Sequence, residues 1–183
     1  DLSDQYVDIV SSGIDLAIRI GELPDSSLVA RKLAPVRRVL CATPKYLEKH
    51  GIPERIEDLD HHALIAPHNQ GPWKLEGKKG SIIYRPNSTL MTNSSEVVRE
   101  TVIAGLGIAL RSTWDVGEEL NDGRLQRVLP EYSATKGLGI YAVYPSRNFL
   151  PAKVRLFIDY LAELFGPTPY WERKKDKSGE QAS

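Results

Sequence analysis

The chain has 183 residues, of which 41% are hydrophobic, so it can bury a core of reasonable size. Its 24 Lys and Arg residues balance 24 Asp and Glu residues. Because there is no basic excess, we do not expect the chain to bind nucleic acid by itself. One cysteine excludes an intramolecular disulfide, and no apolar run approaches the ~20 residues of a membrane span, so we expect a cytoplasmic protein that does not enter a membrane.

The first part of the chain is predicted to contain three strands. Residues 15–20 (DLAIRI) are mostly apolar and stop at Gly21, which favours a strand buried on both faces. Further strands are expected at residues 28–33 and 36–42.

A short helix follows the third predicted strand. Thr43 can cap this helix, Pro44 suits its first position, and Gly51 suits its C-terminal exit. The next stretch is strand-like and broken by turns, with strands expected at residues 63–66, 73–75, 81–85 and 89–92.

A second helix is predicted to begin at Asn93. Asn93 is the expected cap, and Glu96 stands three residues later as a capping-box partner. The amide groups and the dipole of this helix start favour an anion, although Glu96 would compete for the same donors. Asn93, Ser94 and Ser95 are therefore either part of a ligand site or only a capping box.

The last third of the chain continues to alternate strands with helices. Strands are expected at residues 108–110, 125–129 and 139–144, with a helix at 114–120. After Pro151, a helix carries apolar residues on one face, namely Val154, Phe157, Ile158, Leu161 and Phe165. This alternation predicts an α/β protein with largely parallel sheets, whose ligands bind beyond the strand ends.

Signatures of catalysis and of cofactor binding are missing from the sequence. It contains no nucleophile elbow, no P-loop and no dinucleotide-binding glycine pattern. His61, His62 and His68 lack the Cys or carboxylate that would complete a zinc-like spacing, and Cys41 lies in an apolar strand typical of a structural cysteine. We therefore predict no catalytic residue, no metal site and no cofactor.

Four segments resemble one known family: DLAIRIGELPDSSLVARKL, CATPKYLEKHGIPERIEDL, the run from Asn93 that ends in AGLGIAL, and GRLQRVLP. Together with the closing PAKVRLFIDYL helix, they resemble the effector-sensing, or substrate-binding, domain of LysR-type bacterial transcription regulators over residues 2–166. The resemblance implies a fold like that of periplasmic solute-binding proteins, with two α/β lobes and an effector between them.

The resemblance also implies a division of the chain. Residues 43–143 would form the second lobe, and residues 1–42 with 144–166 the first lobe. The first lobe is expected to be incomplete, because the family opens with a further strand, helix and strand, and DNA binding would belong to an N-terminal domain of a longer parent protein. Residues 167–183 are polar and are expected to form a disordered tail.

The resemblance places an effector site between the lobes. Ser3 and Asp4 would enter it from one loop, although either could merely cap a helix, and Ile20 and Gly21 would lie opposite. Asn69 and Gln70 would lie over the ligand, with Trp73 as an apolar wall or a core residue. The predicted effector-binding residues are thus Ser3, Asp4, Ile20, Gly21, Asn69, Gln70, Asn93, Ser94 and Ser95.

The function implied is that of a sensor domain in a homodimeric or homotetrameric transcription regulator, with a small carboxylate or an aromatic metabolite as effector. One alternative is a solute-binding protein of a transport system, which should carry a secretion signal and a complete first lobe. The other is an α/β enzyme, which would need a nucleophile and a base that the sequence does not offer.

Overall fold

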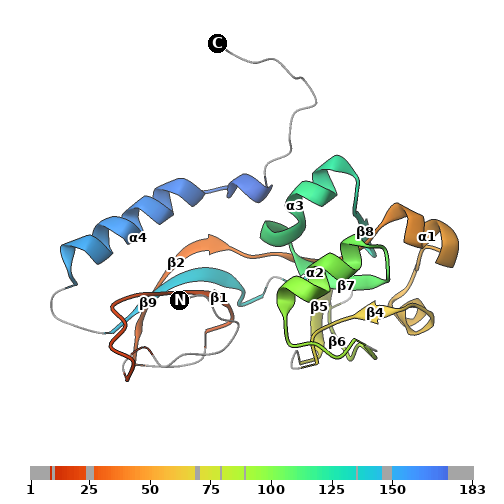
Figure 1. Ribbon diagram of the computed structural model, residues 1–183, viewed down its shortest axis with the longest axis horizontal. Coiled ribbons are helices and arrows are strands. Elements are labelled where there is room, and N and C mark those ends of the chain that lie inside the picture. The colour runs from red at the N-terminus through yellow and green to blue at the C-terminus, as the bar shows by residue number, and fades with distance from the viewer. Residues whose placement is uncertain are drawn as a thin grey trace, which may run out of the picture.

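The chain folds into two α/β units that lie side by side along its long axis (Figure 1). The structure is a computed structural model and describes residues 9, 11–23, 27–68, 71–78, 80–88, 90–134, 136–145 and 150–172. Within these residues, no helix is long and apolar enough to cross a membrane.

The first unit is a three-stranded sheet with one long helix. In spatial order its strands are β1 (Ala17–Gly21), β9 (Gly139–Tyr144) and β2 (Val29–Pro35). Helix α4 (Ala152–Phe165) packs on this sheet, and Val154 and Ile158 are its buried residues. Phe157, which was predicted on the same face, is 47% exposed.

The second unit is a four-stranded sheet with helices on both sides and an attached hairpin. Its strands are β4 (Leu64–Ile65), β7 (Ile108–Ser112), β3 (Arg38–Ala42) and β8 (Gln126–Val128), in that order. The other elements are α1 (Pro44–His50), η1 (Ile56–His61), the hairpin β5 (Trp73–Gly77) and β6 (Gly80–Tyr84), α2 (Ser95–Ile103) and α3 (Thr113–Asp122).

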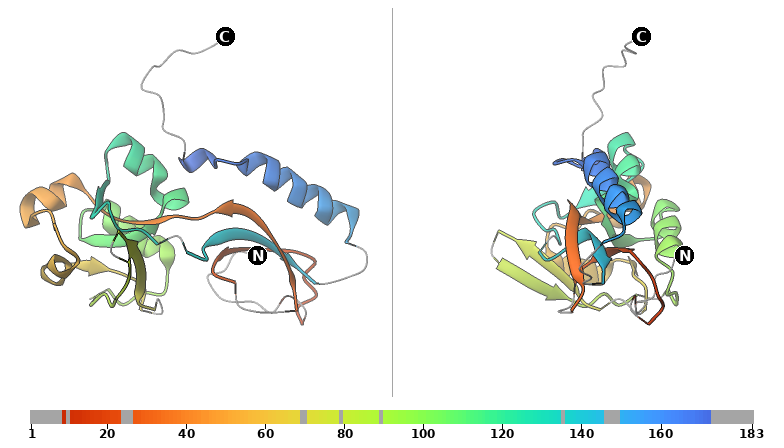
Figure 2. Two further views of the ribbon diagram at one scale, coloured as in Figure 1. Left: turned by 180° about the vertical axis from the view of Figure 1, so that it is seen from behind. Right: turned by 90° about the vertical axis from the view of Figure 1, so that its left-hand side faces the viewer.

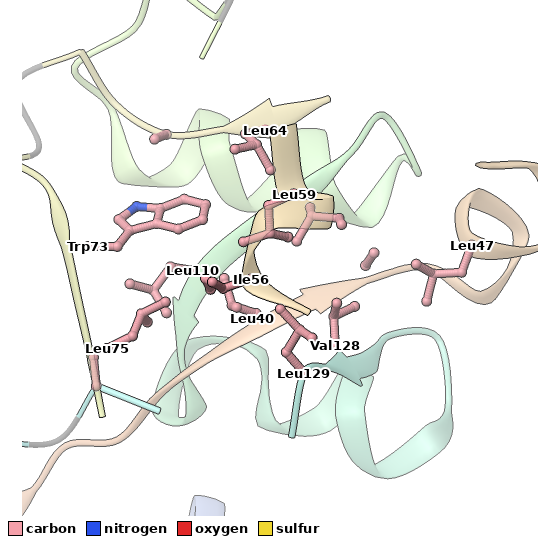
Figure 3. Packing of buried hydrophobic residues seen from close by; sticks show 14 of the residues in the cluster. Leu40, Leu47, Ile56, Leu59, Leu64, Trp73, Leu75, Leu110, Val128 and Leu129 are labelled. Atoms are coloured by element: carbon pink, nitrogen blue, oxygen red, sulfur yellow. The ribbon is translucent and has the colours of Figure 1, made fainter. Parts of the chain in front are cut away.

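Both faces of the four-stranded sheet are buried, because alternate residues of its strands face different cores. Leu40 and Leu110 pack with Trp73 and Leu59 on one face (Figure 3). On the other face Cys41 packs against residues of α2 and α3, among them Val98, Val102 and Val116. Trp73 is therefore a core residue and not the wall of a ligand site.

The pairing of the strands corrects two predictions. Among the described ladders, only β4 with β7 is parallel, so the expectation of largely parallel sheets is wrong. The physical reason is that β9 returns between β1 and β2 and runs against both, while β7 and β8 both run against β3.

The predicted boundaries between the units are also wrong. Residues 36–42 were placed in the first unit, but β3 makes its ladders with β7 and β8 of the second. Conversely, β9 pairs with β1 and β2 of the first unit. The chain thus crosses between residues 35 and 38 and returns between 134 and 139, where Arg38 and Ala134 exchange two backbone hydrogen bonds of 2.9 Å.

Strand β1 differs from the expected strand buried on both faces. Its residues alternate between half-buried and exposed, and Ile18 and Ile20 are 40% and 49% exposed. The reason is that β1 is an edge strand, which pairs only with β9 among the described strands.

Several predicted helix signals are confirmed. The Thr43 hydroxyl accepts from the Tyr46 amide at 3.2 Å, Pro44 begins α1, and Gly51 follows its end with a φ of 88°. In contrast, Leu106 is exposed because α2 ends at Ile103, and residues 90–92 form no strand.

The chain after α4 is partly ordered, which corrects the predicted disordered tail. Residues 167–172 are described and include the short helix η2 (Tyr170–Glu172). Trp171 is buried against Phe165, with ring centroids 5.3 Å apart. The Trp171 side chain supplies apolar area that the polar composition of residues 167–183 conceals. Residues 173–183 lie outside the described part.

Candidate functional site

The start of α2 is capped by Ser94 and not by Asn93. The Ser94 hydroxyl accepts from the Val97 amide at 3.3 Å, and the Ser94 amide donates to the Thr92 hydroxyl at 3.0 Å. Because Thr92 holds Ser94 in this position, Val97 and not Glu96 is the third residue of the helix. The predicted capping box of Asn93 and Glu96 is therefore wrong, and Asn93 lies exposed before the cap.

The second serine of this helix start is turned toward the interior. Arg111 of β7, which is 6% exposed, donates to the Ser95 hydroxyl at 3.2 Å. The same guanidinium donates to Asp115 of α3, and its Nε lies 2.7 Å from that carboxylate. Ser95 thus joins α2 to a buried ion pair, a contact that the sequence pattern did not indicate.

Buried charge continues from this pair into the space between α2 and α3. Arg99 bonds to the buried Glu119 carboxylate at 2.6 Å and lies 3.6 Å from Asp115. Burial, followed by the neighbouring Arg111 guanidinium, lowers the pKa of Arg38 to about 10, so Arg38 remains a cation at neutral pH. Three guanidinium groups face three carboxylates, the third being Glu100 at 2.6 Å from Arg99, so this cluster leaves no formal charge in excess beneath the start of α2.

A pocket of about 330 Å³ lies beside this helix start. It is formed by the segments that follow β4 and β6, and its lining is Ala66, Pro67, His68, Gly71, Pro72, Arg85, Pro86, Asn87, Ser88 and Leu90. The Ser88 hydroxyl accepts from the Ala66 amide at 3.2 Å, which ties the two segments together.

His68 connects the pocket to the start of α2. Its backbone amide donates to the Thr92 carbonyl at 2.9 Å, and its Nδ1 lies 2.8 Å from the same oxygen. Since Thr92 also holds the Ser94 cap, the pocket wall and the helix start form one continuous surface.

Arg85 and Asn87 are site candidates that the sequence analysis missed. Both are exposed residues that line the pocket, and Arg85 makes no ion pair with any other described residue. The available signal was their place directly after β6, because residues beyond the end of a strand often carry binding groups.

The end of β1 lies near this surface from the side of the first unit. Glu22, directly after Gly21, forms an ion pair of 3.1 Å with Lys74 of β5. Pro72, which lines the pocket, is only two residues from Lys74. The predicted residues Ile20 and Gly21 are therefore brought toward the second unit.

Four predicted effector-binding residues lie outside the described residues, and their placement stays a prediction. They are Ser3, Asp4, Asn69 and Gln70. His68 and Gly71, which flank two of them, both line the pocket.

The described part of the chain brings no three His, Cys, Asp or Glu side chains together in a cluster suited to a metal ion. Cys41 is buried, and its thiol lies 3.7 Å from the Ala109 carbonyl. Burial raises the pKa of this thiol to about 12, so it remains protonated at neutral pH, as expected of a structural cysteine.

Residues 1–166 match the LysR substrate binding domain family. The chain belongs to this family. Among curated relatives, the HTH-type transcriptional regulator DmlR of Escherichia coli K12 is 40% identical over 169 residues, which cover 90% of this chain and 54% of DmlR. The chain spans about half the length of the curated relatives it matches.

Solved LysR-type regulatory domains share the fold. The regulatory domain of CrgA from Neisseria meningitidis has a TM-score of 0.79 and 32% identity, over 90% of this chain and 81% of that one. The regulatory domain of AphB from Vibrio vulnificus has a TM-score of 0.72 and 36% identity, over 89% and 81%. The predicted α/β class and periplasmic-binding-protein-like fold are thus confirmed.

Proposed function

We propose that this LysR substrate binding domain is the ligand-sensing part of a transcription regulator and that it binds a small organic effector between its two units. The observation that carries the proposal is the surface that joins the 330 Å³ pocket to the start of α2 and faces the end of β1. Family membership supports it, as do the names of relatives such as DmlR, a transcriptional regulator, and TtdR, a transcriptional activator.

The chemistry of this surface favours an effector that carries a carboxylate. Arg85 offers a guanidinium, and Arg is well suited to bidentate carboxylate recognition. The dipole of α2 adds in the same direction. Leu90, the prolines of the pocket and the exposed Ile20 offer apolar contacts to the rest of the molecule. An aliphatic or an aromatic carboxylate fits this combination.

Binding without turnover is part of the proposal. The polar groups of the site are suited to hold an anion, and the chain's thiol is protonated and buried in the core. DNA contact would be made by another part of the parent protein, and a homodimer or homotetramer would match the symmetry of a pseudo-palindromic DNA site.

The experiment that tests the proposal is calorimetric titration with succinate and benzoate as probes of the aliphatic and aromatic carboxylates. Saturable binding of either probe is expected, and Arg85→Gln should weaken it at least several-fold, since a hydrogen bond to a charged group contributes about 1.5–3 kcal/mol. Arg127→Gln is the matched control, because Arg127 is an exposed arginine of β8 that does not line the pocket. Equal affinity of the two variants would contradict the assigned site.

A further inference from the structure

The segment that follows α4 leaves the first unit and packs on the second. Figure 2 shows η2 at the end of α4, directly beside α3, and contacts between α3 and η2 agree with this view. Besides the two crossings of the chain at residues 35–38 and 134–139 and the ion pair of Glu22 with Lys74, this contact is a further connection between the units.

Trp171 contacts both units. Its ring packs in the core of the first unit, against Phe165. Its backbone lies on α3, where a Cβ atom added at Gly117 would be 3.1 Å from the Trp171 carbonyl oxygen. Gly117 therefore permits the close approach of η2 to α3.

Glu172 fastens the segment to the crossing itself. Its carboxylate accepts a 2.5 Å hydrogen bond from the Thr113 hydroxyl at the start of α3 and lies 3.7 Å from the Arg37 guanidinium. The Thr113 amide in turn donates to the Arg37 carbonyl at 2.8 Å. Glu172 thus holds α4 of one unit to the first turn of α3 of the other.

The contact lies across the crossings from the candidate site. In Figure 1, α4, η2 and α3 occupy the upper side, β2 and β9 run below them, and β1, β5 and β6 lie on the lower side. If the units rotate about the crossings, the lower side can close only as the upper side opens. Closure around an effector therefore separates η2 from α3.

We propose that residues 169–172, the C-terminal strap, hold the two units in their present arrangement and oppose further closure at the candidate site, with Trp171 and Glu172 as positioning residues. The ion pair of Glu22 with Lys74 already joins the units on the side of that site. The site's role as an effector site rests on the proposed function, whereas the mechanical role of the strap does not. Breaking the strap shifts the population toward the closed arrangement, and an effector that requires closure binds more tightly as a result.

The individual contacts of the strap are weak. The Arg37 side chain is half-exposed, so its ion pair with Glu172 contributes little in water. The indole N–H of Trp171 is buried without a hydrogen-bond partner among the described residues, which reduces the gain from burying its ring. The contact therefore biases the equilibrium between two arrangements without locking either.

The test is a distance measurement across the lower side by double electron–electron resonance, with spin labels on Ile18→Cys and Ile83→Cys. Both positions are exposed, one on β1 and one on β6, and the native Cys41 is buried and does not take up label. Glu172→Ala should shift the distance distribution toward shorter values, because the strap no longer holds α3. The fold should survive this change, since the Thr113 hydroxyl also lies 3.2 Å from the Arg37 carbonyl oxygen.

Glu163→Gln is the matched control, because it removes an exposed carboxylate of α4 that does not touch α3. It should leave the distribution as in the unmodified strap. Trp171→Phe gives a second variant, which keeps an aromatic side chain but loosens its fit, and should produce a smaller shift in the same direction. An unchanged distribution in both Glu172→Ala and Trp171→Phe would overturn the strap, and it would leave the proposed effector site standing.

Discussion

Arg111 donates a hydrogen bond to Ser95 at 3.2 Å and so fixes the start of α2 to the strand that lies beneath it. Its other contact, with Asp115, extends this attachment to α3. The two serines of the helix start therefore have different tasks: Ser94 caps the helix, and Ser95 anchors it. This division of roles predicts which substitutions change stability and which change binding.

Replacing Ser94 with Ala should lower the free energy of unfolding by about 1 kcal/mol, because the Val97 amide loses its side-chain acceptor. Asn93→Ala should change it by less than about 0.5 kcal/mol, because Asn93 is exposed and precedes the cap. Urea denaturation of both variants measures the difference. A larger loss of unfolding free energy in Asn93→Ala than in Ser94→Ala would show that Asn93 is the helix cap.

Removing the Arg111 side chain should be much more costly. Arg111→Met leaves the Asp115 carboxylate, 8% exposed, without its main partner, and the expected loss is about 3–5 kcal/mol. The double variant Arg111→Met with Asp115→Leu should recover most of it, because no uncompensated charge then remains at that position. If the double variant is as unstable as Arg111→Met alone, the unpaired carboxylate is not the cause.

The sequence predicted the helices better than the sheets, for a physical reason. Helix signals are local, so Thr43, Pro44 and Gly51 could be interpreted from their neighbours alone. Strand direction depends on partners far along the chain, and nothing in residues 36–42 indicates that they pair with β7 and β8. The expected boundaries and the expected parallel pairing failed for this reason.

The part of the candidate site at the start of a helix was predictable from the sequence, whereas the part formed by loops was not. The region of residues 93–95 was identified, yet its cap was placed one residue early, because Asn and Ser are both favoured as caps and the sequence does not choose between Asn93 and Ser94. Arg85 was missed because a single arginine after a strand carries no motif. Trp171 was missed because one buried aromatic ring was averaged into a polar segment.

The stability of the chain should decrease as the pH falls from about 7.5 to 5.5. Burial, reinforced by the nearby His50, lowers the pKa of His62 below its usual 6.5, so the unfolded chain takes up the proton more readily. The contribution of neutral His62 is present above about 6.5 and is lost as the pH falls toward the folded pKa. Thermal unfolding at both pH values should show a smaller difference in His62→Gln than in the unmodified chain. An equal difference in both proteins would contradict the role of His62.

The thiol of Cys41 should not react with a disulfide reagent in the folded protein at pH 8. Burial in the core raises its pKa to about 12, so both access and thiolate are lacking. Lys45→Cys provides the control, because Lys45 is exposed at the start of α1 and its replacement should react at once. Complete reaction of the unmodified chain without denaturant would show that the core opens on the time scale of the assay.

One NMR measurement tests whether this chain binds a small carboxylate and releases it chemically unchanged. The chain is mixed with succinate or benzoate, and line broadening of the ligand and its remaining amount are followed in the same tube. We expect saturable broadening that decreases in Arg85→Gln, with the ligand signal undiminished over hours. Steady conversion to a product at an enzyme-like rate, abolished by Arg85→Gln, would contradict this expectation.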